Sequence, residues 1–176
     1  IDELTGRVRF LPPGPDMALE SFSSNNELFM LPEKQGVRLQ APLIVDGAEP
    51  GTFDRFGKNV EAIIPSGTVV SSFLLYFHHA ERREKAVYHE LKGTITFARS
   101  IVGVIGGSQK LKAADSVVGL PSIRYAEHDR WRGLGRNEDK RTPEDVLEVS
   151  ADRRTLRFRL HSGRAMDQFR VLVEAE

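Results

Sequence analysis

The feature that most constrains the fold is a strict alternation of polar and apolar residues near the C-terminus. Residues 155–160 read Thr-Leu-Arg-Phe-Arg-Leu, so Leu156, Phe158 and Leu160 fall on one side of an extended chain. In a strand, successive side chains point to opposite faces of the sheet. The pattern therefore predicts a strand with one face packed on a core and the other face in water.

Two further strand patterns flank this one. Residues 146–149 form a short apolar run, and residues 150–154 have the length and polarity of a hairpin connection to the next strand. Residues 169–173 alternate again, with Phe169 on one side of the chain and Arg170 on the other. Three strands are therefore predicted at the C-terminal end of the chain.

Earlier segments have the same character, and Gly, Pro, Asn or Ser clusters separate them. They are residues 37–39, 60–64, 69–77, 91–97 and 101–105. Gly103 weakens the last of these segments and is predicted to mark a bulge. Helix signals are few, since residues 111–118 have room for only a turn or two.

Many short strands with little helix are typical of sandwiches and barrels. We therefore expect residues 1–176 to form a single all-β domain. The predicted architecture is a jelly-roll-like sandwich of two antiparallel sheets, with about eight to ten strands.

Composition narrows the classes of partner. Lys plus Arg and Asp plus Glu both number 25, so the chain lacks the basic excess that binding to nucleic acid usually needs. It contains no cysteine, which excludes disulfides and thiolate chemistry. No run approaches the roughly 20 apolar residues of a membrane-spanning helix, so we expect no transmembrane segment. The start, Ile-Asp-Glu, lacks a signal-peptide pattern, so an export signal is expected to lie outside this sequence.

One segment departs from the strand pattern. Residues 127–145 carry eleven charged residues and the only tryptophan, Trp131, and are predicted to form a long exposed loop. An exposed aromatic ring can stack on a sugar while polar neighbours bind its hydroxyls. The candidate ligand-binding residues are therefore Trp131, Tyr125, Arg130 and Arg132. The alternative is that Trp131 anchors the loop against the sandwich.

Three aspartates in turn-like surroundings, Asp46, Asp54 and Asp115, are candidate ligands for calcium, which takes carboxylate and carbonyl oxygens. Turns and helix caps are the alternative explanation for single aspartates. Residues 103–107, Gly-Val-Ile-Gly-Gly, weakly resemble a phosphate-binding loop. That reading is rejected, because a Lys-Ser/Thr ending is missing and no helix is predicted to follow.

Several runs resemble a recurring pattern in exported bacterial β-sandwich domains, of the kind that often precede a PEP-CTERM sorting signal. The runs are residues 51–54, 64–77, 93–97, 101–105, 150–156 and 166–171, which together span roughly residues 50–173. They consist mainly of strand and turn residues, so the resemblance implies the fold and export, and it implies no catalytic residues.

These observations lead us to expect a non-enzymatic binding or structural module, secreted or at the cell surface. Its expected partner is a glycan or another surface protein, and not nucleic acid. Two alternatives stay open, a carbohydrate-active enzyme domain and a subunit of a larger extracellular assembly. An enzyme should have convergent carboxylates or a metal. A binding module should have a binding face, and a subunit should have an apolar patch or an open strand edge.

Overall fold

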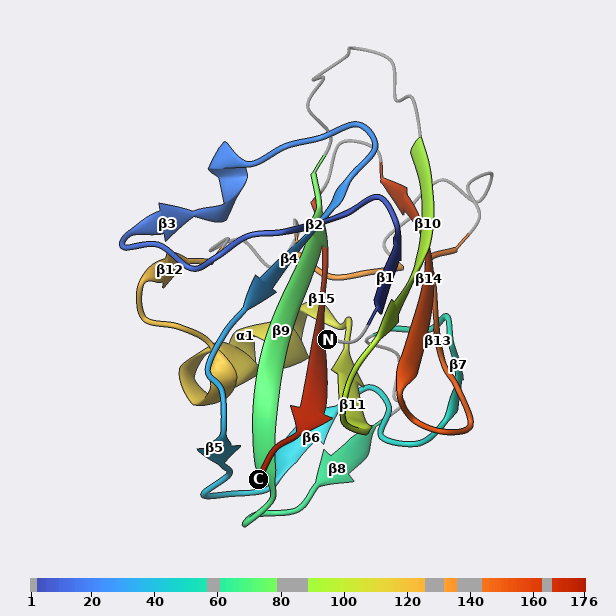
Figure 1. Ribbon diagram of the computed structural model, residues 1–176. Helices are drawn as coiled ribbons and strands as arrows, with labels where there is room; N and C mark the ends of the chain where they lie inside the picture. The colour runs from blue at the N-terminus through green and yellow to red at the C-terminus, as the bar shows by residue number, and fades with distance from the viewer. Residues whose placement is uncertain (1–2, 57–60, 79–88, 126–131, 136–143, 163–165) are drawn as a thin grey trace.

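The computed structural model describes residues 3–56, 61–78, 89–125, 132–135, 144–162 and 166–176 (Figure 1). These residues form fifteen strands, one α-helix and one short 3-10 helix. The prediction of an all-β fold with little helix is confirmed. The strands belong to four sheets, of which two are large and two have only two strands.

The first large sheet has five strands, which are all antiparallel to their neighbours. In spatial order its strands are β1 (Glu3–Gly6), β10 (His89–Thr96), β14 (Thr155–Ser162), β13 (Val146–Val149) and β7 (Gly51–Phe53). The predicted hairpin between β13 and β14 is confirmed, since the backbone N–H of Ser150 donates to the Thr155 carbonyl at 2.9 Å.

The second large sheet has six strands and is built around the long strand β9. Its main order is β11 (Ile101–Ile105), β15 (Asp167–Glu174), β9 (Val69–Phe77), β4 (Leu28–Pro32) and β2 (Val8–Phe10), and β5 (Val37–Arg38) also pairs with β9. The pairing of β11 with β15 shifts register between Ile101 and Gly103, which confirms the predicted bulge.

The remaining elements cover the outer face of the six-stranded sheet. They are β3 (Met17–Ala18) paired with β12 (Ile123–Arg124), β6 (Leu43–Val45) paired with β8 (Ala62–Ile64), η1 (Leu19–Ser21) and α1 (Ser108–Val118). In Figure 1, α1, β3 and β12 lie on one side of β9 and β15, and the five-stranded sheet lies on the other side.

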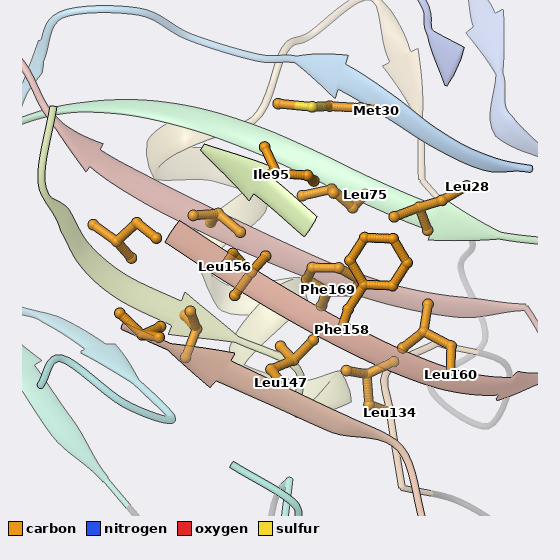
Figure 2. Packing of buried hydrophobic residues seen from close by; sticks show 14 of the residues in the cluster. Leu28, Met30, Leu75, Ile95, Leu134, Leu147, Leu156, Phe158, Leu160 and Phe169 are labelled. Carbon is orange, nitrogen blue, oxygen red and sulfur yellow. The ribbon is translucent and has the colours of Figure 1, made fainter. Parts of the chain in front are cut away.

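The six-stranded sheet therefore has apolar clusters on both faces. One cluster combines side chains of the two large sheets, such as Phe158 of β14 with Leu75 of β9 and Phe169 of β15 (Figure 2). The second cluster joins residues of the opposite face, such as Leu74, to Leu111 of α1. A strand covered on both sides must be apolar on both sides, which explains the continuous run Phe-Leu-Leu-Tyr-Phe in β9.

Two finer predictions need correction, and a third is not confirmed. The strand count is too low, because many strands of the N-terminal half are only two to five residues long and carry no clear periodicity. A two-sheet antiparallel jelly roll is not confirmed, because there are four sheets, and β2–β4 and β3–β12 pair in parallel. The helix is longer than predicted: α1 begins at Ser108 and its buried residues include Leu111, Ala114 and Val118.

In the described part of the chain, no helix has the length and apolar character needed to cross a membrane.

Candidate functional site

A cluster of charged side chains is buried between the six-stranded sheet and α1. Its centre is Arg170 of β15, whose side chain is fully buried. Its Nε and Nη2 donate to the two carboxylate oxygens of Glu33 at 2.6 and 2.7 Å. Nη2 also reaches Asp115 of α1 at 2.9 Å, and Nη1 donates to the Leu111 carbonyl at 3.1 Å. Each of the three guanidinium nitrogens therefore donates at least one hydrogen bond.

A second arginine extends the cluster toward the charged segment. Arg132 is 1 % exposed and binds both carboxylate oxygens of Asp115, at 2.5 and 3.0 Å. Its Nε donates to Gln168 of β15 at 2.9 Å. Asp115 therefore links two arginines, and Arg132 ties the segment 132–135 to both α1 and the sheet.

Tyr125 and Ser72 complete the hydrogen bonding. The Tyr125 hydroxyl donates to Glu33 at 2.6 Å and accepts from the Leu120 backbone N–H at 2.8 Å. Both guanidiniums lie near its ring, at 5.3 Å for Arg132 and 5.8 Å for Arg170. The Ser72 hydroxyl donates to the other Glu33 oxygen at 2.6 Å. We call these seven residues the buried charge cluster: Glu33, Ser72, Asp115, Tyr125, Arg132, Gln168 and Arg170.

The cluster contains two arginines and two carboxylates, so its formal charges balance. Burial lowers the pKa of Arg170, but Glu33 and Asp115 raise it by more, so the guanidinium stays charged. Burial beside Glu33 raises the pKa of the Tyr125 hydroxyl, which therefore remains a donor. Such a saturated network has few free groups to offer a ligand, and its evident effect is to hold α1 on the sheet.

The predicted ligand-binding residues thus fall into two groups. Trp131 and Arg130 lie outside the described residues. Tyr125 and Arg132 are side by side, as predicted, but their polar groups contact the buried charge cluster. The described part of the charged segment is only partly exposed: Gly135 and Glu144 are exposed as predicted, whereas Leu134 is 2 % exposed and packs in the core between the large sheets, and its backbone N–H donates to the Gly106 carbonyl at 2.8 Å.

Asp46 has a structural role at the start of α1. It is 3 % exposed, and its Oδ2 accepts hydrogen bonds from the backbone N–H groups of Gly106 and Gly107, both at 2.7 Å. Its Oδ1 lies 2.6 Å from Lys110 Nζ. A helix does follow residues 103–107, contrary to expectation, and the anion at its N-terminus is this carboxylate.

The three predicted calcium ligands are not brought together. Asp115 contacts two arginines in the buried charge cluster, and Asp54 is exposed, 3.9 Å from Arg55. Among the residues described, no group of three or more acidic or histidine side chains is arranged to hold a metal ion. Calcium binding at one of these aspartates stays a prediction.

An open hollow lies on the five-stranded sheet, on the face turned away from the core, with a volume of about 480 Å³. It has the size of a small-molecule binding site. We call it the outer groove. Its lining residues come from β10, β14 and β13: Lys92, Gly93, Thr94, Val146, Glu148, Arg157, Phe158 and Arg159.

The charges of the outer groove are exposed, unlike those of the buried charge cluster. Arg157 lies 2.8 Å from Glu148 on the neighbouring strand. Lys92 lies 2.8 Å from Glu90, which stands outside the lining. Among the described residues, Arg159 has neither an ion pair nor a hydrogen bond from its side chain. Within the part of the chain that the structure describes, one cation of the groove is therefore left without a counter-ion.

Most of these residues could not be found from the sequence. Glu33, Ser72 and Gln168 gave no periodic signal, and nothing in a single sequence shows that distant charges meet. Part of the outer groove was predictable, since Arg157 and Arg159 are the outward positions of the alternating strand. The sequence does not reveal the pairing register, which places Lys92 of β10 opposite Arg159 of β14.

Comparison with models of protein families, with curated proteins and with solved structures found no match for this chain.

Proposed function

We propose that this chain is a non-enzymatic binding module of a secreted or cell-surface protein, and that its partner binds in the outer groove. The observation that supports this is the groove itself, an open concave face lined by long polar side chains. The resemblance to exported β-sandwich domains agrees with such a role, and the two large sheets with a core between them support the interpretation of the fold as a jelly-roll-like sandwich. In this view the buried charge cluster stabilises the scaffold, and the partner is a glycan or a surface protein.

The arrangement of carboxylates favours binding over glycoside hydrolysis. A glycosidase needs two carboxylic groups on either side of the bond that it cleaves. Among the described residues, Glu148 is the one carboxylate that lines the outer groove, and it is paired with Arg157. The enzyme alternative is tested by incubating the purified chain with oligosaccharides and analysing the products, because a binding module should leave their length unchanged.

The binding proposal is tested on a glycan array and in a pull-down from surface extracts. Arg159→Glu should abolish binding without lowering the melting temperature, since the side chain is exposed. The charged segment is the competing site, so Trp131→Ala is the matched comparison. If Trp131→Ala abolishes binding while Arg159→Glu does not, the partner engages the charged segment and the groove is the wrong face.

A second candidate, a subunit of a larger assembly, is favoured by one apolar pair. Ile44 of β6 and Ile63 of β8 are register partners and are 46 % and 62 % exposed. Two adjacent exposed isoleucines on a two-stranded sheet form a small adhesive surface. Sedimentation velocity tests this candidate: self-association that Ile63→Lys removes would support it, and a monomer at all concentrations would argue against self-assembly.

A further inference from the structure

The outer groove also indicates the chemistry of its ligand, an inference that rests on the proposed binding function. Its outward side chains form two rows across three strands. Register pairs set Thr94, Arg157 and Glu148 in one row, and Lys92, Arg159 and Val146 in the other. Neighbouring strands are about 4.8 Å apart, so side chains within a row touch one ligand together.

The lining is more basic than the chain as a whole. The chain has 25 basic and 25 acidic residues, whereas the described residues of the lining include three cations and one carboxylate. Counting Glu90 beside Lys92, the local surplus is one positive charge. Arg159 provides that surplus, because it is the cation that lacks a counter-ion within the described residues. An anionic group on a ligand would supply this counter-ion.

The two existing ion pairs do not block such a ligand. The side chains of Arg157 and Glu148 are 59 % and 44 % exposed, and those of Lys92 and Glu90 are 60 % and 44 % exposed. Pairs this exposed contribute little to stability, so an anion can replace either carboxylate at low cost. Arginine then offers the planar, two-donor geometry that suits carboxylate and sulfate groups.

The position of the groove favours a saccharide over an extended peptide. A peptide that joins a sheet pairs with the backbone of an edge strand. The groove instead lies over β10, β14 and β13, which are interior strands of their sheet. Recognition must therefore use side chains, with Thr94 for a hydroxyl and Val146 and the arginine stems for the C–H face of a ring.

We propose that the outer groove binds an anionic saccharide that carries carboxylate or sulfate groups. Arg159 is the central anion contact, and Lys92 and Arg157 flank it. Val146 forms the apolar contact beneath the sugar ring.

The test is calorimetric titration of the full chain with four probes of matched length. They are an oligogalacturonate, a sulfated oligosaccharide, a neutral galactose oligomer and a polyglutamate peptide. The first, the second or both should bind, and the affinity should fall as salt is raised from about 50 to about 300 mM. Whichever of them binds identifies the anionic group.

Two variants and one control locate the site. Arg159→Gln and Val146→Glu should each weaken binding about ten-fold or more, by removing a charged contact or adding a repulsive one. Arg9→Gln removes another exposed arginine, from β2 of the other large sheet, and should leave the affinity unchanged. Unchanged melting temperatures exclude unfolding as the cause.

The alternative outcomes are distinct. Equal affinity for the neutral oligomer, or an Arg159→Gln variant that binds as well as the parent chain, overturns the anionic assignment while the binding function stands. Binding of polyglutamate alone overturns the saccharide class. If no probe binds and the glycan array and pull-down are also empty, the proposed function fails together with this inference.

Discussion

Arg170 and Glu33 form a two-point ion pair from which solvent is excluded, with Nε–Oε2 and Nη2–Oε1 distances of 2.6 and 2.7 Å and both side chains 0 % exposed. The pair joins β15, near the end of the chain, to the residue that follows β4. Because Asp115 of α1 shares the same guanidinium, the ion pair also fixes the helix against the sheet. These charged side chains are hydrogen-bonded to one another, so removal of one leaves another with an uncompensated buried charge.

The first prediction concerns this dependence. Arg170→Met should lower the free energy of unfolding by about 3 to 5 kcal/mol, because it leaves Glu33 buried and unpaired. The measurement is urea-induced unfolding. Adding Glu33→Gln to Arg170→Met should cost less than the sum of the two single changes, because the second change removes the orphaned charge. Additive costs would show that the two groups do not interact.

The second prediction tests the facing of β14. Phe158→Ala should cost about 3 to 5 kcal/mol, because the ring is 4 % exposed in the core between the large sheets. Arg157→Ala should cost under about 1 kcal/mol, because its side chain faces water and its ion pair is exposed. Both are measured by urea-induced unfolding, and equal costs would contradict this facing of the strand.

Much of the fold from β9 onward could be predicted from the sequence. The strands β9, β11 and β13 have the predicted bounds, because each is an apolar run that ends at turn residues. The N-terminal half was harder. A strand such as β3 has two residues, which is too short for any period to appear. β4 is buried on both faces and therefore shows no alternation.

The buried charges were the least predictable part of the site. The alternation in β15 correctly places Arg170 on the other face of the sheet from Phe169. Because an arginine is normally exposed, this pattern alone predicts that Arg170 faces water. Its face is buried because α1 packs on it, and α1 itself has only three or four apolar positions on its inner side. A single sequence does not show that Glu33, Asp115 and Arg170 meet, because their pairing depends on the complete sheet order.

The third prediction concerns the start of α1. Its N-cap residue, Gly107, has no side chain, and the Asp46 carboxylate accepts hydrogen bonds from the backbone N–H groups of Gly106 and Gly107, just before the helix begins. Asp46→Ala should lower the free energy of unfolding by about 2 to 3 kcal/mol, through loss of these two hydrogen bonds and of the contact with Lys110. Asp46→Asn keeps one acceptor and should cost less. Thermal unfolding compares the two, and the same scans with added calcium or EDTA test the calcium prediction.

The fourth prediction is a pH dependence at Asp145, which is 1 % exposed. Burial raises the pKa of its carboxyl, although the backbone N–H groups of Gly135 and His161, at 2.9 and 2.8 Å, act in the opposite direction. A carboxyl whose pKa is higher in the folded state binds its proton more tightly there. Its contribution to stability is therefore complete below the unfolded pKa and is lost as the pH rises through the folded pKa.

Asp145→Asn removes this titration, so the comparison isolates the carboxyl. The free energy of unfolding of the parent chain minus that of Asp145→Asn should fall as the pH rises through the unfolded pKa, about 4, and become constant once the pH exceeds the folded pKa. Asp152 is the matched control, because a hydrogen bond from the Ser150 hydroxyl lowers the pKa of this exposed carboxyl. The corresponding difference for Asp152→Asn should therefore rise as the pH rises through the acidic range. Urea-induced unfolding at a series of pH values measures both, and a rising difference for Asp145→Asn would mean that its two backbone donors outweigh burial.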